Sequence, residues 1–101
     1  MTAGETASQA GHAFLASYTK VPSEVAAAYV ADEGGTNVVL ACPDEASVWQ
    51  AYKRACDASI PCHLWMESDW KGRGPTVTAL GIGPVDRSKV KPIVKDFKLM
   101  P

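Results

Sequence analysis

The stretch Gly-Arg-Gly-Pro-Thr-Val-Thr-Ala-Leu-Gly-Ile-Gly-Pro, from Gly72 to Pro84, decides the fold. Its middle part, Thr76–Leu80, contains threonine and valine, which fit a pleated and largely buried surface. Glycine and proline stand on both sides of this part and mark turns or close backbone approaches. We therefore predict an interior strand over Thr76–Leu80, with Val77 and Ala79 among the most buried residues of the chain.

The length and composition indicate one globular domain over residues 1–101. Hydrophobic residues make up 47% of the chain and charged residues 21%, which is enough for a single core. No apolar run approaches the ~20 residues of a membrane helix, so we expect no membrane partner. The three cysteines, Cys42, Cys56 and Cys62, have no metal-ligand spacing, and we expect reduced, mostly buried thiols in a cytoplasmic protein.

The two halves of the chain differ in charge. Residues 1–50 hold one cation and six acids, whereas residues 51–101 hold nine cations and five acids. A basic half could face the phosphates of a nucleic acid. An ordinary solvated surface explains the same counts equally well, so charge alone leaves both interpretations open.

The periodicity of apolar residues predicts alternating helices and strands. We expect helices over 5–20 and Ser23–Asp32, a strand over Thr36–Ala41, a helix over 44–58, strands over 61–66 and Thr76–Leu80, a helix from Asp86 or Ser88 to Phe97, and a tail over 99–101. This order predicts an α/β fold with three layers, α/β/α, around a small mixed sheet. The connection between the last two strands is too short for a parallel crossover, so the last strand should be antiparallel.

The first predicted helix has two distinct faces. The apolar stripe, which we expect to contact the sheet, consists of Ala7, Ala10, Gly11, Phe14, Leu15 and Tyr18. The opposite stripe carries Glu5, Gln9 and His12, and a histidine near a carboxylate could do general acid–base work. The same polar stripe could also be a solvated helix surface.

A second group of polar residues lies in the loop that follows the strand over 61–66. Carboxylates such as Glu67 could orient a water molecule, and Lys71 and Arg73 could contact phosphate. Trp70 in the same loop could stack on a base. An ordinary polar loop is again the alternative. No Ser-His-Asp pattern, phosphate-binding loop, dinucleotide fingerprint or metal-ligand spacing is present in the sequence.

The block Thr-Val-Thr-Ala-Leu-Gly-Ile-Gly-Pro, residues 76–84, resembles the signature of the archaeal and eukaryotic type of peptidyl-tRNA hydrolase, which also has bacterial members. The resemblance extends from about Gly4 to Leu99. It implies the fold of that family and hydrolysis, without a metal or other cofactor, of the ester that joins a peptide to the 3′ ribose of tRNA.

The resemblance also implies roles for individual residues. The segment over 4–13, Gly-Glu-Thr-Ala-Ser-Gln-Ala-Gly-His-Ala, is similar to a family segment with functional Gln and His, which places Gln9 and His12 in the site. Glu5 stands where the family has its catalytic lysine. The segment over 61–68 aligns with the family's Pro-Cys segment and puts Glu67 at the position of the catalytic aspartate.

Two functions therefore remain open. In the first, Glu67 positions or deprotonates a water molecule, while Gln9 and His12 hold the substrate end. Backbone amides near Gly81 and Gly83 would then help to stabilise charge. In the second, the changes at Glu5 and in the loop after Glu67 make the chain a non-catalytic member that binds RNA or protein.

The resemblance further implies that one strand is missing. In the family, a strand precedes the segment that contains Gly4, and it lies between the counterparts of Thr36–Ala41 and Thr76–Leu80. Only Met1 to Ala3 precede Gly4 here, fewer than the ~5 residues of a usual strand. We therefore expect three strands in this chain. Either Thr36–Ala41 pairs directly with Thr76–Leu80, or a gap remains between them that a homodimer or a partner strand could fill. We favour the gap, because the helices over 6–19 and 44–58 suit a four-stranded sheet and cannot easily move inward.

Overall fold

The computed structural model describes residues 1–32, 38–42 and 44–99. Within them the chain forms, in order, α1 (Ala3–Tyr18), α2 (Ser23–Ala31), β1 (Leu40–Ala41), α3 (Glu45–Asp57), β2 (Cys62–Glu67), β3 (Thr76–Ile82), α4 (Arg87–Val94) and β4 (Lys98–Leu99). The predicted α/β class is confirmed.

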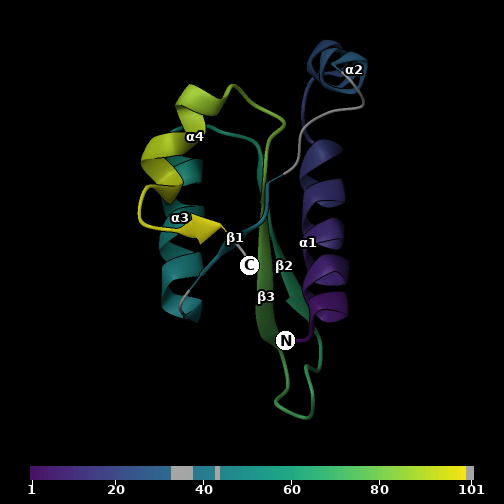
Figure 1. The fold of residues 1–101 in the computed structure, drawn as a ribbon, viewed down its shortest axis with the longest axis vertical. Coiled ribbons are helices and arrows are strands. Elements are labelled where there is room, and N and C mark those ends of the chain that lie inside the picture. Colours follow the sequence, from purple (N-terminus) through teal and green to yellow (C-terminus); the bar gives the residue numbers. More distant parts are fainter. Residues whose placement is uncertain (33–37, 43, 100–101) are drawn as a thin grey trace.

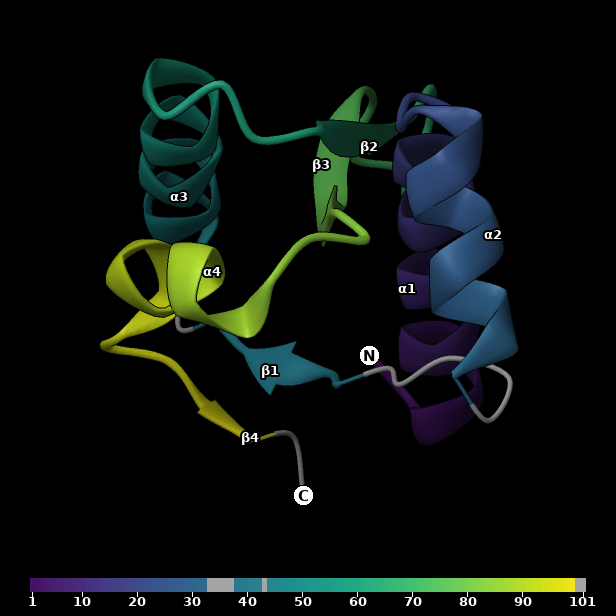
Figure 2. The same cartoon turned by 90° about the horizontal axis from the view of Figure 1, so that it is seen from above.

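The hairpin of β2 and β3 lies between two layers of helices, with α1 on one side and α3 and α4 on the other (Figure 1). The view from above shows the same separation, with α3 far from the pair of α1 and α2 (Figure 2). Helix α2 packs on α1 through Tyr29, whose ring centroid lies 5.7 Å from that of Phe14 and 6.2 Å from that of Tyr18. The three-layer arrangement therefore agrees with the prediction.

Helix α1 begins at Ala3, earlier than predicted, because Thr2 caps it. The Thr2 hydroxyl accepts a hydrogen bond from the backbone N–H of Glu5 at 3.1 Å, and the Glu5 carboxylate accepts one from the backbone N–H of Thr2 at 2.7 Å. This reciprocal capping box pairs two donors that a helix start otherwise leaves unpaired. It also fixes the direction of the Glu5 side chain.

The face of α1 that packs on the hairpin is not the predicted apolar stripe. Its buried residues, spaced four apart, are Gln9, Ala13 and Ser17. From the predicted stripe, Leu15 is 63% exposed and Ala7 and Gly11 are also exposed. Phe14 and Tyr18 contact Tyr29 of α2 instead. The large side chains are excluded from the sheet because α1 lies very close to it.

Gly81 on β3 permits this close approach. A Cβ atom at Gly81 would lie 2.1 Å from the backbone oxygen of Ala13, a distance that atoms cannot adopt. One turn further along α1, the Ser17 hydroxyl lies 2.6 Å from the backbone oxygen of Gly83 and 3.3 Å from that of Pro61. Small and polar residues therefore join α1 to the hairpin.

Strands β2 and β3 are antiparallel, as predicted, and a β-bulge interrupts their register. The pairing moves from Trp65–Ala79 directly to Met66–Val77, so Thr78 is an extra residue on β3. A bulge of this kind redirects a side chain and often lies beside a functional site.

The strand predicted over Thr36–Ala41 is shorter and pairs elsewhere. Of its described part, only Leu40–Ala41 is a strand, and Val38 and Val39 are 56% and 41% exposed. The positions 36 and 37 lie outside the described residues. β1 pairs with β4, so the predicted tail over 99–101 is wrong at Leu99, which pairs with Leu40.

The sheets of the described residues are both two-stranded and antiparallel, so the predicted mixed sheet is not formed there. Within the same residues β3 pairs with β2 alone, and Val38 and Val39 are not in a strand. This agrees with the expected gap rather than with direct pairing of the two strands. Association through this edge stays a prediction; sedimentation equilibrium tests it, and a monomer at every concentration would contradict it.

The hydrophobic core lies on the other side of the hairpin, toward α3 and α4. Its buried members are Ala51, Ala55, Ile60, Cys62 and Ile93. Val77 is buried as predicted, at 7% exposed, whereas Ala79 is only half-buried. Asp86, one of the two predicted caps, begins α4 by accepting a hydrogen bond from the Ser88 N–H at 3.0 Å.

The three cysteines are free thiols, but they are not mostly buried as predicted. Cys62 is buried, Cys42 is half-buried and Cys56 is exposed. Burial, together with the neighbouring Cys56, raises the pKa of the Cys62 thiol to about 11. Cys56 is exposed because the buried face of α3 runs along Ala51 and Ala55, and Cys56 lies one position beyond Ala55.

Candidate functional site

One face of β2 carries a row of polar and aromatic side chains. His63, Trp65 and Glu67 alternate along the strand and therefore project from the same face. The Trp65 ring stacks on His12 of α1, with centroids 4.9 Å apart and an interplanar angle of 14°. The His63 ring lies 6.1 Å from Trp65, and its Nδ1 atom is buried without a partner among the described residues. The row faces α1 and ends with Glu67 beside the turn.

Glu67 is held by hydrogen bonds. The indole Nε1–H of Trp65 donates to Oε1 of Glu67 at 2.9 Å. This bond, then a side-chain hydrogen bond from Gln9 and the nearby charge of His12, lower the pKa of Glu67 below its ordinary value. The carboxylate is therefore ionised at neutral pH and has a fixed orientation. Because a lowered pKa makes it a weaker base, Glu67 is better suited to orient a water molecule than to remove a proton outright.

Gln9 connects Glu67 to β3. It is only 7% exposed, and its Oε1 accepts a hydrogen bond from the Thr78 hydroxyl. Because the amide oxygen is used in this way, the amide NH₂ is left to donate to Glu67. The bulge at Thr78 makes this contact possible. Gln9 was predicted on a polar stripe that could be solvated, and the structure places it inside the hairpin–helix contact instead.

His12 is the exposed member of the cluster. Besides stacking on Trp65, its Nε2 atom lies 3.5 Å from the hydroxyl oxygen of Ser8. An exposed imidazole near an ionised carboxylate can exchange protons with a bound molecule. The structure thus brings together three of the predicted site residues, Gln9, His12 and Glu67.

The turn between β2 and β3 brings Lys71 to Glu5. The Nζ atom of Lys71 lies 3.0 Å from Oε2 of Glu5, and it also lies 5.4 Å from the ring centroid of Trp70. Arg73 is exposed in the same turn. The predicted loop residues therefore lie at the end of the hairpin that carries Glu67, since Glu67 pairs with Thr76.

Gly81 and Gly83 do not join this cluster. Gly81 pairs with His63, toward the opposite end of the hairpin, and packs against the backbone of Ala13. The N–H of Gly83 donates to the backbone oxygen of Pro61 at 2.8 Å. The expectation that these amides stabilise charge in the site is not supported, because they serve the packing of α1 and the hydrogen bonds of the hairpin.

Trp65 and Thr78 belong to the candidate site but were not predicted from the sequence. Trp65 could have been found from its spacing, since His63 and Trp65 stand two apart on the strand predicted over 61–66, and Glu67, which was predicted in the following loop, continues the same spacing. Thr78 could not have been found in this way, because the alternation of side chains along a regular strand from Thr76 does not predict a bulge. The bulge depends on how two strands pair, which is not a local property of either.

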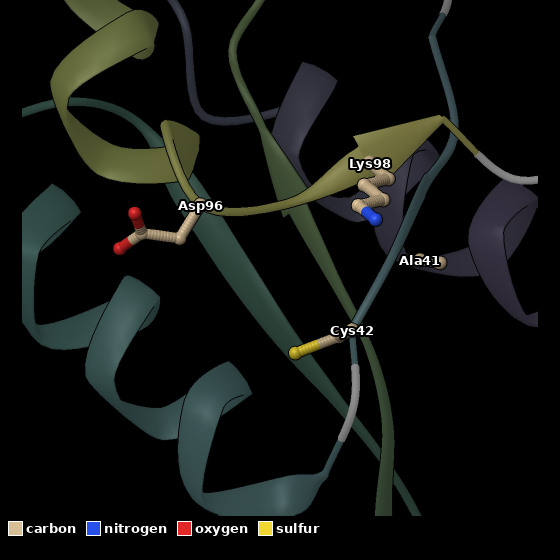
Figure 3. Close-up of a pocket in the computed structure, with 4 residues that line it drawn as sticks. All are labelled: Ala41, Cys42, Asp96 and Lys98. Atoms are coloured by element: carbon tan, nitrogen blue, oxygen red, sulfur yellow. The ribbon is translucent and has the colours of Figure 1, made fainter.

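A separate pocket lies beside β1 and β4 and is lined by Ala41, Cys42, Asp96 and Lys98 (Figure 3). None of the predicted site residues lines it. Among the described residues, no group of three or more His, Cys, Asp or Glu side chains is arranged to hold a metal ion. No helix in the described part of the chain is long and apolar enough to cross a membrane.

The fold and the cluster around Glu67 define a small α/β protein with a polar site at one end of a hairpin, built from a carboxylate, an amide and an exposed imidazole. Comparison with known proteins shows the family to which this chain belongs. The model of the family Peptidyl-tRNA hydrolase PTH2 matches residues 1–100, and the chain belongs to this family.

Two relatives show the extent of the similarity. The chain is 31% identical to a peptidyl-tRNA hydrolase of Methanococcus maripaludis (strain C6) over 104 residues, which cover 99% of this chain and 89% of that protein. It is 30% identical to a peptidyl-tRNA hydrolase of Methanococcus vannielii over 103 residues, with the same coverage of 99% and 89%. The resemblance inferred from the block over 76–84 is thereby confirmed.

Proposed function

We propose that this chain hydrolyses the ester bond between a peptide and the 3′ end of tRNA. The observation that carries the proposal is the Glu67 carboxylate, which is oriented by Trp65 and Gln9 and lies near the exposed His12. A carboxylate held in this way can place a water molecule for attack on an ester carbonyl. The family, and the names of the relatives, support peptidyl-tRNA as the substrate.

In the proposed reaction, Glu67 orients a water molecule whose oxygen attacks the ester carbonyl carbon. The bond between this carbon and the ribose oxygen then breaks, which gives a peptide with a free carboxyl group and a tRNA with a free 3′ hydroxyl. His12 is the exposed acid–base group that can take the proton lost by the attacking water and pass it to the leaving ribose oxygen, while the second proton of the water stays on the new carboxyl group. Gln9 holds Glu67 and, through Thr78, ties it to β3.

A basic surface supports tRNA as the larger part of the substrate. The exposed cations in and after α4 are Arg87, Lys89, Lys91, Lys95 and Lys98. Helix α4 lies at the opposite end of the long axis from the β2–β3 turn, and the longest extent of the molecule is 40 Å (Figure 1). Contacts at both ends could therefore span part of a tRNA. We assign phosphate contacts to Lys71 and Arg73 and base stacking to Trp70.

The test is the release of the acyl group from an N-acetylated aminoacyl-tRNA by purified protein. We expect turnover by the natural sequence and a loss of about 100-fold in Glu67→Gln, a change that keeps size but removes the charge. Glu24→Gln, an exposed residue of α2, is the matched control and should turn over normally. No release above background at micromolar protein would overturn the proposed function.

The same assay decides the alternative of a non-catalytic RNA- or protein-binding member. If tRNA binds but is not hydrolysed, the double change Glu5→Lys with Glu67→Asp should be tested. Activity in that double variant alone would show that the natural chain has lost catalysis. Because peptidyl-tRNA arises during translation, we also propose that the protein works in the cytoplasm, where its three free thiols stay reduced.

A further inference from the structure

An ion pair between the start of α1 and the β2–β3 turn takes no part in holding Glu67. The Nζ atom of Lys71 lies 3.0 Å from Oε2 of Glu5 and 3.1 Å from Oε1. The Lys71 and Glu5 side chains are 48% and 30% exposed, and ion pairs at this exposure contribute little to stability. The ion pair is therefore not well explained by a contribution to stability. The placement of its two charges needs a different explanation.

The carboxylate of Glu5 has a fixed position on α1. It accepts the backbone N–H of Thr2, and this hydrogen bond, with the one from Lys71, lowers the pKa of Glu5 to about 2. Glu5 is thus negatively charged at every pH at which the protein would work. It stands one helical turn before Gln9, on the end of α1 that contacts the β2–β3 turn.

The turn holds Lys71 in an uncommon backbone conformation. Lys71 has a φ of 54°, which non-glycine residues rarely adopt, and it is followed by Gly72 and Gly74 at 78° and 75°. Asp69 accepts the N–H of Gly74 at 2.8 Å, and the N–H of Trp70 donates to the Gly74 carbonyl at 3.1 Å. This compact turn presents Lys71 toward α1, and Glu5 then holds its ammonium group.

A substrate that carries phosphates needs such a cation here. Glu5 and Glu67 are both ionised, and each carboxylate repels a phosphodiester that approaches this end of the hairpin. The Lys71 ammonium neutralises Glu5 and still leaves about half of its side chain open to solvent. It can therefore contact a further anion while it remains paired.

We infer that Lys71 binds a phosphate of the 3′-terminal nucleotides of the substrate and that Glu5 acts as the positioning residue for its ammonium group. This inference rests on the proposed function, because it takes the ester-bearing end of tRNA as the ligand. It assigns Glu5 a role through Lys71 rather than a direct part in the chemistry at the ester.

The test is a double-mutant cycle of Glu5→Gln and Lys71→Met, with Lys53→Met on the exposed side of α3 as control. Glutamine at this position still allows a capping box, so helix α1 should keep its start. The measurements are KM and kcat for N-acetylated aminoacyl-tRNA and the Kd of deacylated tRNA at several salt concentrations.

Loss of one phosphate contact in Lys71→Met should raise KM and Kd about tenfold and change kcat less than about twofold. The slope of log Kd against log salt concentration should fall by about one. Glu5→Gln alone should raise KM about threefold, because the ammonium is no longer held. In the Lys71→Met background the same change should lower KM, because it removes a repulsive carboxylate. A purely structural pair would not produce this reversal of sign.

Two results would overturn the inference. One is a Lys71→Met variant that binds tRNA as the Lys53→Met control does. The other is a Glu5→Gln change that improves binding in both backgrounds, which would make Glu5 only a repulsive charge. If the natural sequence binds deacylated tRNA but releases no acyl group, the proposed function fails, while the Kd values still decide the roles of Glu5 and Lys71. If it binds no tRNA, the inference fails as well.

Discussion

The two faces of the β2–β3 hairpin are packed by different chemistry. Toward α3 and α4 the contacts are made by buried apolar side chains such as Ala55 and Ile93, which form the hydrophobic core. Toward α1 the buried positions are small or polar, and hydrogen bonds join the helix to the strands: Gln9 accepts one from Thr78, and Ser17 donates one to Gly83. The site residues lie on this second face or next to it.

The difference shows how a small domain can keep stability and function apart. Apolar burial contributes most of the favourable free energy of folding, and it is concentrated on the α3 side. The α1 side has less apolar surface to bury, so it can carry an ionised carboxylate and its hydrogen-bond partners. We therefore expect substitutions on the two faces to affect different measurements, and four experiments test this comparison.

The largest expected effect on stability comes from the α3 side. Ile93→Ala should reduce the free energy of unfolding by about 2–5 kcal/mol, because it leaves a cavity among buried residues at a position only 3% exposed. Denaturant unfolding measures the change, and kcat of the folded fraction should stay the same. Val30→Ala on α2, where Val30 is 52% exposed, is the control. A large fall in kcat with normal stability would break the comparison.

Gly81→Ala should show how far α1 depends on close approach. Its new Cβ would lie 2.1 Å from the backbone oxygen of Ala13, so α1 must move away from β3. Overpacking of this kind costs about 1–3 kcal/mol, and because α1 carries Gln9 and His12 the variant should lose activity as well. Gly11→Ala is the matched control, since a Cβ at this position meets nothing within 4 Å. This substitution should stabilise the helix by about 0.5–1 kcal/mol. Equal effects of the two changes would contradict the packing described here.

Thr78→Val tests the hydrogen bond at the bulge. The change keeps the shape of the side chain but leaves the buried Gln9 oxygen without its donor, which should cost about 1 kcal/mol in stability. We expect kcat to fall about tenfold, because Gln9 no longer holds Glu67 in place. Thr19→Val, at the exposed end of α1, should leave kcat unchanged. Unchanged kcat in Thr78→Val would remove Thr78 from the site.

The smallest expected effect concerns acid pH. Because the pKa of Glu5 is lowered from 4.5 to about 2, its contribution to stability is present above pH 4.5 and is lost as the pH falls toward 2. In Lys71→Met the pKa of Glu5, followed by NMR, should rise but remain below 4.5, since the backbone hydrogen bond from Thr2 is the larger cause. A Glu5 pKa that does not move would show that the ion pair is absent in solution.

Much of the fold could be predicted from the sequence because its signals are local. The apolar spacing in α3, the cap at Asp86 and the strand around Val77 each depend on neighbouring residues, and each is found in the structure. The short connection after Glu67 correctly predicted an antiparallel hairpin. The block over 76–84 identified the family, and through it Gln9, His12 and Glu67 as neighbours in space.

Other features were decided by tertiary contacts. Both stripes of α1 are compatible with a helix, and the one with Gln9 is buried because Gly81 brings the two backbones too close for Leu15 or Phe14 to fit between them. The pairing of Leu40 with Leu99 joins residues far apart in sequence, which no local pattern specifies.

The site divides in the same way. The sequence by itself determined which side chains are available, and it placed Glu67 directly after a predicted strand and Glu5 in the first turn of a helix. Only the tertiary structure decided their partners, Trp65 and Gln9 for Glu67 and Lys71 for Glu5. The physical reason is that periodicity and capping act over a few residues, whereas a bulge, a close helix–strand contact and an ion pair each require two distant segments to meet.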